Sequence, residues 1–281
     1  MAFAFLVVGT SIKLAVFPLH QWLPNAYTYA PSIVSAFLAA TATKVAYYVL
    51  LRFIFTLFGV TFVFEVVGLS YLLLPLSLIA MFVGSAAAIY QTNIKRLLAY
   101  SSIAQIGYMT LGLSLANQEG LTGGLVHLFN HALMKGGLFL VVACIVFRTG
   151  SAQIEDMRGL GRRMPLTMAA FLIGGLSLIG VPGTVGFVSK WYLVLGALDR
   201  GWPIVAFLIL ASSLLAAVYV WRVVEVMYFQ EGELAPRKEA SLSRLVPTWA
   251  LIGATIFFGL NTDFPLGVAG RAAGLLLGGA Q

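Results

Sequence analysis

The sequence has 281 residues, of which 60% are hydrophobic and only 10% charged, and its formal net charge is +7. A soluble domain carries roughly 25% charged residues, so this composition excludes an ordinary soluble protein and makes a lipid bilayer the expected solvent. The basic residues lie mainly between apolar runs, which excludes nucleic-acid binding, and the single Cys144 excludes a disulfide framework.

Apolar stretches of about 20 residues, long enough to cross a bilayer as a helix, recur along the chain. The first covers residues 2–17 and is followed by a short broken piece over 18–30. The others lie at roughly 31–57, 66–90, 96–115, 121–147, 165–197, 202–229 and 245–261. These runs lack the alternation of a membrane β-barrel, and an open sheet edge is not stable in lipid. The sequence therefore predicts an all-α, polytopic membrane protein with about eight transmembrane helices.

Basic residues collect in alternate connections between these runs. One connection holds Lys95 and Arg96, the next but one holds Arg158, and a third holds Lys238 and Arg244. The opposite connections are poor in bases. The positive-inside rule then places the basic connections in the cytoplasm, and residues 117–120 and both termini outside.

The first apolar run contains a lysine close to a break in the helical pattern. Lys13 lies within the run, and Pro18 and Pro24 follow it. A lysine near the end of a span can snorkel to the interface, and prolines also kink ordinary membrane helices. A broken helix, however, leaves backbone groups unpaired, which is tolerated only beside a cavity or inside protein. We therefore interpret Lys13, Pro18 and Pro24 as part of a working site.

The middle of the chain places four more ionisable side chains inside spans. Lys44 lies in the second span, and His127, His131 and Lys135 follow one face of the fifth at spacings of four residues. A charged side chain at mid-bilayer costs roughly 2.5–3.5 kcal/mol, so these groups should face protein or a hydrated cavity. Desolvation favours the neutral form of a lysine, which makes such a group a carrier of protons. A lone buried histidine can be structural, but the file predicts a proton path.

A second break interrupts the sixth long run. Gly180, Pro182 and Gly183 interrupt the helical pattern there, and Lys190 follows within ten residues. Paired broken segments are typical of transporters built from inverted repeats. We expect one complete five-helix repeat over residues 59–230, the end of a preceding inverted repeat over 1–58, and a C-terminal helix and tail over 231–281.

Four segments carry a resemblance to a known family. They are "KLAVFPLHQWLPNAYTYAPSIVSAFLAATATKVAYYVLLRF", "QTNIKRLLAYSSIAQIGYM", "HLFNHALMKGGLFL" and "GVPGTVGFVSKWYLVLGAL". Together they resemble the antiporter-like subunits, which include the proton-pumping membrane subunits of NADH:quinone oxidoreductase and the large subunits of Mrp-type cation/proton antiporters. The residues of the last two motifs favour the Mrp-type branch of the family over the respiratory one.

The resemblance implies roles for the residues already singled out. Lys13 resembles the lysine of the first broken helix, Lys44 the connecting lysine, and Lys190 the lysine of the second broken helix. His127, His131 and Lys135 resemble the central file. The resemblance also implies about fourteen helices and a glutamate that pairs with the first lysine, and this sequence shows neither. The missing helices then belong to a companion polypeptide, or the sequence is a fragment.

Three functions stay open on this basis. The first is a proton-translocating subunit of a multi-subunit monovalent cation/proton antiporter in the bacterial cytoplasmic membrane, with other membrane subunits as partners and Na⁺ or K⁺ as candidate exchanged ions. The second is a membrane subunit of an NADH:quinone oxidoreductase or a related hydrogenase. The third is a non-transporting assembly remnant. One cysteine and no flavin, haem or nucleotide motif lead us to expect no cofactor, no metal site and no redox centre in this chain.

Overall fold

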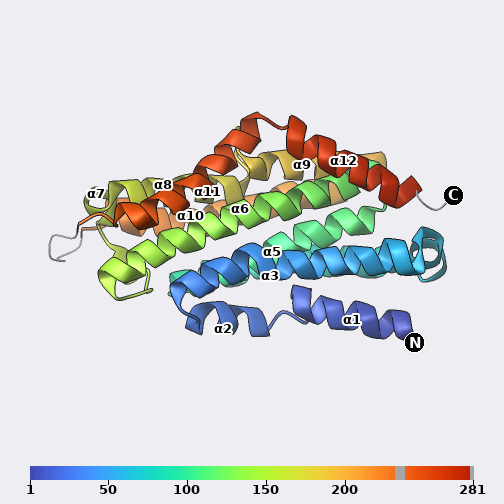
Figure 1. The fold of residues 1–281 in the computed structure, drawn as a ribbon, viewed down its shortest axis with the longest axis horizontal. Helices are drawn as coiled ribbons and strands as arrows, with labels where there is room; N and C mark the ends of the chain where they lie inside the picture. The colour runs from blue at the N-terminus through green and yellow to red at the C-terminus, as the bar shows by residue number, and fades with distance from the viewer. Residues whose placement is uncertain (232–237, 279–281) are drawn as a thin grey trace.

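A computed structural model describes residues 1–231 and 238–278 of the chain. These residues form twelve α-helices and no strand, with one isolated bridge between Asn93 and Gln153. The long helices run side by side along one axis of an elongated bundle (Figure 1). Five helical segments of the described residues are long and apolar enough to cross a membrane: Ser32–Phe58, Leu69–Ile89, Gln118–Thr149, Pro203–Phe229 and Leu242–Leu260. Two shorter helices, Ala2–Leu14 and Pro165–Ile179, are also apolar. The expectation of an all-α, polytopic membrane protein is thereby confirmed.

The first third of the chain contains the first break and the first full crossing. Helix α1 (Ala2–Leu14) ends at Ala15, and α2 (Trp22–Tyr29) begins after a turn that contains Pro18. Pro24 lies in the first turn of α2, where its missing N–H costs little. Helix α3 (Ser32–Leu51) follows and continues into the π-helical segment η1 (Arg52–Phe58), so that the membrane segment is Ser32–Phe58. Gly59 ends this helix, and a second π-helical segment, η2 (Thr61–Val66), leads to α4.

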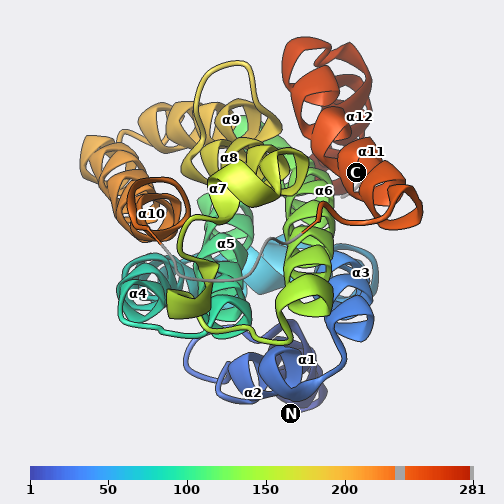
Figure 2. The same cartoon turned by 90° about the vertical axis from the view of Figure 1, so that its left-hand side faces the viewer.

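Two helices form the centre of the bundle. Helix α4 (Leu69–Ile89) leads to α5 (Ile94–Leu115) and α6 (Gln118–Thr149), and Figure 2 shows α5 and α6 surrounded by the other helices. Almost every residue of α5 is buried. Small residues permit this packing: a Cβ on Gly112 would lie within 3 Å of the backbone of Gly120 and Gly124. Close approach through small residues is the usual basis of helix association in membranes, because lipid offers no hydrophobic drive for it.

The second break lies where the sequence predicts it. After η3 (Glu155–Met157) and α7 (Leu160–Arg163), five residues separate the end of helix α8 (Pro165–Ile179) from the start of α9 (Val185–Asp199). Gly180 and Gly183 have φ angles of 90° and 86°, which favour glycine, and Pro182 lies between them. The single predicted span over 165–197 is therefore two half-helices.

The C-terminal part differs from the expectation of one helix and a tail. Helix α10 (Pro203–Phe229) precedes the undescribed residues 232–237, and α11 (Leu242–Leu260) is followed directly by α12 (Asp263–Gly278). Both α11 and α12 pack on α6, and they run in the same direction along the bundle with a bend near its middle (Figure 1). The polar residues and the proline of "NTDFPLG" interrupt the apolar run, so a prediction based on apolar runs does not identify α12 as a helix.

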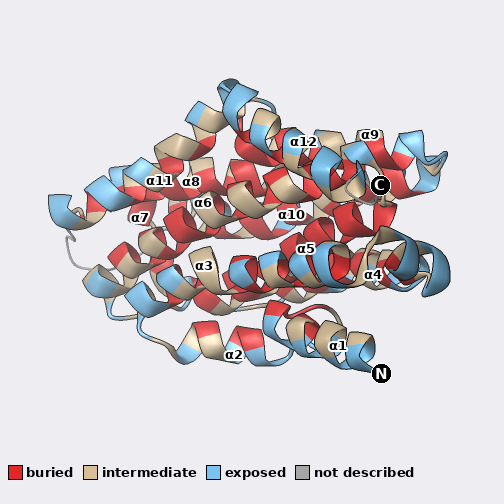
Figure 3. Cartoon of the chain, turned by 45° about the vertical axis from the view of Figure 1, so that its right-hand side comes forward, coloured by how far each residue is buried: buried red, intermediate tan, exposed pale blue. Residues whose placement is uncertain are grey.

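The two C-terminal breaks touch each other. A Cβ on Gly259 would lie 2.6 Å from the carbonyl oxygen of Gly183, so the end of α11 packs directly on the link between α8 and α9. The junctions α1–α2 and α11–α12 both lie near the middle of the bundle's length (Figure 1). Buried residues follow the inward faces of all these helices, whereas the outward faces are exposed and rich in large apolar side chains (Figure 3). The outward faces therefore suit contact with lipid or other apolar helices.

The basic connections gather at one end of the bundle. Thr92, in the α4–α5 connection, accepts a backbone hydrogen bond from Ile154 in the connection after α6. Arg148, at the end of α6, donates to the carbonyl of Glu239 in the α10–α11 connection at 2.5 Å. The three connections that the positive-inside rule assigns to one side are thus neighbours in space.

Candidate functional site

Lys44 and Lys135 come from the facing helices α3 and α6. Both are buried, with 6% and 0% of their surfaces exposed. The Lys44 ammonium donates to the carbonyl of Ala39 on its own helix. The Lys135 ammonium donates to the carbonyl of Leu98 at 2.8 Å and to the hydroxyl of Ser101, both on α5. The two lysines interact electrostatically with one another.

Lys190 lies on α9 and points back to the break. Its ammonium donates to the carbonyls of Leu178 and Ile179, at 2.9 and 2.8 Å, which are the last two residues of α8. It also donates to the Ser213 hydroxyl at 3.0 Å and lies 4.7 Å from the centre of the Tyr108 ring. The break therefore has a definite chemical use, because the free carbonyls at a helix C-terminus attract a cation.

His127 and His131 lie on α6, the helix that also carries Lys135, and both are fully buried. Their rings stack with centroids 6.1 Å apart and an interplanar angle of 12°. The His127 Nδ1 is 2.8 Å from the Ser189 hydroxyl on α9. The His127 Nε2 and both His131 nitrogens have no hydrogen-bond partner among the described residues. Buried polar atoms in proteins are nearly always satisfied, so three unpaired nitrogens in one place set this pair of histidines apart from an ordinary core.

The arrangement joins five of the six predicted proton-path residues. His127 interacts electrostatically with both Lys44 and Lys190, and His131 interacts with Lys44 and Lys135. All the direct hydrogen-bond partners described above are neutral carbonyls and hydroxyls. Within residues 1–231 and 238–278 none of these three lysines has a carboxylate partner. An ionised lysine here lacks a counter-ion among the described residues, so burying its charge is costly.

Lys13 is placed differently from the other five residues. It lies in the last turn of α1, and its side chain is exposed. The nearby turn is well organised, because the Trp22 indole donates to the carbonyl of Ile12 at 2.8 Å. The structure thus brings Lys44, His127, His131, Lys135 and Lys190 together and leaves Lys13 on the outer side of the first broken helix.

Several polar partners of the basic groups do not stand out in the sequence. Ser101, Ser189 and Ser213 each bond one of them directly. Asn130, next to the predicted file, donates to the carbonyl of Val185 at 2.6 Å and so links α6 to the start of α9. Serines are common in membrane helices, so a single serine does not identify a site. The polar residues spaced along "YSSIAQIGY" are the one sequence signal for the face of α5 that contacts Lys135.

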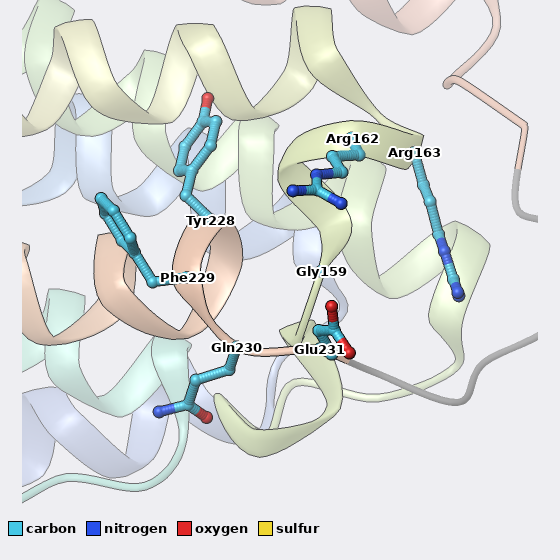
Figure 4. Close-up of a pocket in the computed structure, with 7 residues that line it drawn as sticks. All are labelled: Gly159, Arg162, Arg163, Tyr228, Phe229, Gln230 and Glu231. Atoms are coloured by element: carbon cyan, nitrogen blue, oxygen red, sulfur yellow. The ribbon is translucent and has the colours of Figure 1, made fainter.

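A surface cavity lies apart from this buried group. It has a volume of about 280 Å³ and is lined by Gly159, Arg162, Arg163, Tyr228, Phe229, Gln230 and Glu231. Figure 4 shows the two arginines on the α7 side and the aromatic residues at the end of α10. The cavity belongs to the end of the bundle that holds the basic connections and touches none of the proton-path residues.

Comparison with known proteins gives consistent matches. The family described as NADH:quinone oxidoreductase/Mrp antiporter, TM, matches residues 1–216. NADH-quinone oxidoreductase subunit N from Desulforudis audaxviator is 46% identical over 255 residues, covering 89% of this chain and 49% of that protein. F(420)H(2) dehydrogenase subunit N from Methanosarcina mazei is 34% identical over 246 residues, covering 83% and 48%.

The fold matches as well. A chain of the Mrp complex from a Dietzia species superposes with a TM-score of 0.89 at 26% identity, covering 98% of this chain and 59% of that one. The present chain therefore spans about half the length of the curated relatives that it matches.

Proposed function

We propose that this chain, which belongs to the NADH:quinone oxidoreductase/Mrp antiporter transmembrane family, carries protons through the membrane as part of a larger proton-translocating complex. One observation carries the proposal: basic groups from α3, α6 and α9 are buried together with neutral partners only. A purely structural core would not bury three lysines without a counter-ion, because each costs several kcal/mol when ionised.

The mechanism follows from the repulsion between these groups. A proton that reaches Lys44 disfavours a second positive charge on Lys135, and a charge on Lys190 acts in the same way on His127. Arrival of one proton therefore promotes release of the next, and the pair titrates as a unit. The free histidine nitrogens offer the intermediate positions, with water as the link.

The sequence relatives bear on the branch of the family. The 46% identity to an oxidoreductase subunit N supports the alternative of a membrane subunit of an oxidoreductase over the Mrp-type branch that the motifs favour. Likeness to the Mrp complex in fold keeps the cation/proton antiporter as the second candidate. The chain is similar both to a subunit of an NADH-quinone oxidoreductase and to a subunit of an F(420)H(2) dehydrogenase. We therefore propose that partner subunits, and not this chain, determine the electron donor. We propose that the complex lies in the bacterial cytoplasmic membrane. We also propose that residues 1–58 and 59–230 belong to two successive repeats, and the broken helix formed by α8 and α9 supports this division.

The test is substitution of Lys44 in everted vesicles that contain the whole complex. We expect Lys44→Ala to assemble and to abolish formation of a pH gradient, since a relay fails when one central site cannot hold a proton. Lys44→Arg should also fail, because a guanidinium does not release its proton. Lys238→Ala, an exposed lysine in the α10–α11 connection, is the matched control and should transport normally. A normal pH gradient with Lys44→Ala would reject the proposal.

A further inference from the structure

A groove on the surface of the bundle lies between α3, α6 and α11, at the end that holds the basic connections. It has a volume of about 500 Å³. Its walls are the first turn of α3, two turns near the end of α6 and the first two turns of α11, and none of the proton-path residues lines it. Figure 2 shows α3 and α11 packed on neighbouring sides of α6.

The groove is closed toward the middle of the bundle and open toward its end. A Cβ on Gly136 would lie 2.9 Å from a methyl group of Leu251 and 3.3 Å from the Cβ of Ala40, so α3 and α11 both reach α6 there. The groove begins one turn later at Leu140, and its α6 wall reaches Phe147, about 10 Å farther at 1.5 Å per residue. This shape accepts an extended hydrocarbon chain from the end of the bundle.

The walls of the groove are apolar except at its outer end. Ala143 and Val146 line it from α6, and two polar side chains deeper in it, Cys144 and Thr248, are buried. The Thr248 hydroxyl donates to the carbonyl of Arg244 within α11, so it has no hydrogen left to donate to a ligand. The inner groove therefore suits hydrocarbon rather than a polar molecule.

Arg244 places a positive charge at the outer end of the groove, in the first turn of α11. Its guanidinium carbon lies 3.4 Å from the centre of the Phe147 ring. Among the described residues its one hydrogen-bond partner is the Ser241 hydroxyl at 3.0 Å, and it forms no ion pair. The Glu239 carboxylate is bound to the start of α8 instead. A guanidinium has five N–H donors, so Arg244 keeps donors for an anion.

We propose that this groove binds an anionic phospholipid, with the phosphate group at Arg244 and one acyl chain along α6 toward Gly136. Arginine binds phosphate through paired, charge-assisted hydrogen bonds, and basic pockets between membrane helices recognise anionic head groups. Arg148, whose guanidinium carbon lies 5.8 Å from the centre of the same Phe147 ring, adds a second positive charge near the head group. The inference requires only that the chain lies in a membrane, and it does not depend on proton transport.

A second groove separates the effect of the arginine from that of apolar volume. It lies between α8 and α10, has a volume of about 490 Å³ and is lined only by apolar side chains, among them Leu176, Ala217 and Trp221. A lipid chain in this second groove meets no charge that distinguishes one head group from another. The two grooves are therefore a matched pair of similar volume, and only the first should select an anionic lipid.

The first experiment measures lipid binding to the purified whole complex by native mass spectrometry, with phosphatidylglycerol, phosphatidylcholine or inorganic phosphate as the probe. Phosphatidylglycerol should bind at lower concentration than phosphatidylcholine, and inorganic phosphate should not displace it, because phosphate lacks an acyl chain. We expect Arg244→Gln to raise the phosphatidylglycerol concentration for half-occupancy about fivefold and to affect phosphatidylcholine less. Ala143→Leu, which fills the groove, should remove about one bound phosphatidylglycerol per complex.

Two control variants match these substitutions. Lys238→Gln removes an exposed charge at the same end of the bundle outside the groove, and Ala217→Leu fills the second groove. Neither should change the binding of phosphatidylglycerol. Equal binding by Arg244→Gln and Lys238→Gln would overturn the proposal, as would equal affinity of the unsubstituted complex for the two phospholipids.

A second measurement leaves Arg244 and Ala143 in place, so it does not depend on the folding of those variants. In vesicles with equal amounts of the two phospholipids, a photo-reactive phenylalanine analogue replaces either Ile33, an exposed residue of the groove, or Leu214, an exposed residue of α10 outside both grooves. Lipid adducts at Ile33 should be enriched in phosphatidylglycerol, whereas those at Leu214 should follow the composition of the vesicle. Adducts of Ile33 without that enrichment, or adducts with a partner subunit that covers the groove, would overturn the proposal.

Discussion

Lys190 shows how a break in a helix and a buried charge depend on each other. The carbonyls of Leu178 and Ile179 are free because Gly180 ends α8, and the ammonium of Lys190 satisfies both. A continuous helix would use those carbonyls internally and leave the lysine without acceptors. The second break therefore frees two carbonyl oxygens that bind the Lys190 ammonium.

Gly186 should be the residue that keeps these parts in register. A Cβ at this position would clash with the carbonyl oxygen of Ser177, so α8 and α9 approach one another here more closely than any other residue type permits. We expect Gly186→Ala to destabilise the protein by about 1–3 kcal/mol and to impair proton transport, because the carbonyls that bind Lys190 must shift. Melting of the detergent-solubilised protein and vesicle transport measure the two effects.

The control for this substitution is Gly253→Ala in α11. A Cβ there meets nothing within 4 Å, and alanine is a better helix former than glycine by up to about 1 kcal/mol. The melting temperature of Gly253→Ala should stay equal or rise. If Gly186→Ala behaves in the same way, the close contact does not hold the break together.

The sequence reveals the basic residues of the site more readily than their partners. Lys44 and Lys190 stand out because a charge within an apolar run is costly and therefore rare. Ser101 and Ser213 do not stand out, since hydroxyl side chains cost little in a helix and their role depends on the residues that face them. The same argument that identifies Lys44 also identifies Lys13, yet the exposure of Lys13 depends on how α1 packs on α3, which no local pattern predicts.

At the scale of elements, a residue in a connection between helices fixes the position of a half-helix. The Glu239 carboxylate accepts from the Leu166 amide at 2.9 Å and from the Thr167 hydroxyl at 2.5 Å, at the start of α8. An anion at a helix N-terminus is favoured by the helix dipole. The connection before α11 thus fixes one end of α8, and the end of α11 packs against the other at Gly183.

Breaks marked by glycine and proline are predictable, and those marked by polar residues are less so. Gly180, Pro182 and Gly183 interrupt a long apolar run, so the α8–α9 break is evident from the sequence. The α11–α12 break lies at Asn261 and Thr262, which look like the end of a span and the start of a tail. As a result Asp263, at the start of α12, is a carboxylate near the middle of the bundle's length, although it lies outside every span predicted from apolar runs.

The direction of the helices gives a prediction for the two ends of the bundle. Single cysteines at Glu119 and Lys238, after replacement of Cys144, should react with an impermeant thiol reagent from opposite sides of the membrane, Glu119 from outside and Lys238 from the cytoplasm. Glu119 is preferable to Asn117, because the Asn117 side chain caps α6 by accepting from the Gly120 amide. Labelling of Lys238 from outside, with Glu119 protected, would invert the topology.

At the scale of the whole molecule, the structure separates Lys13 from the other five residues of the proposed proton path. The chain spans about half the length of its curated relatives, and Lys13 lies exposed beside the α1–α2 break near the middle of the bundle. Around it the outer faces of α1 and α3 are apolar, with Phe5 and Phe37 strongly exposed. An ionised lysine facing lipid at that depth costs roughly 2.5–3.5 kcal/mol, so Lys13 needs cover or a counter-charge to act in a relay.

We therefore expect the 281-residue chain alone, purified and reconstituted in liposomes, to conduct protons poorly and to show no exchange of cations for protons. The five buried groups would still be in place, but the charge of Lys13 would face lipid without a carboxylate beside it among the described residues. A pH-sensitive dye inside the liposomes measures the flux under an imposed Na⁺ or K⁺ gradient. Co-reconstitution with helices that bring a carboxylate to Lys13 should restore coupling, and replacing that carboxylate by its amide should remove it again. Strong antiport by the chain alone would show that Lys44, the histidine file and Lys190 suffice, and that Lys13 needs no partner.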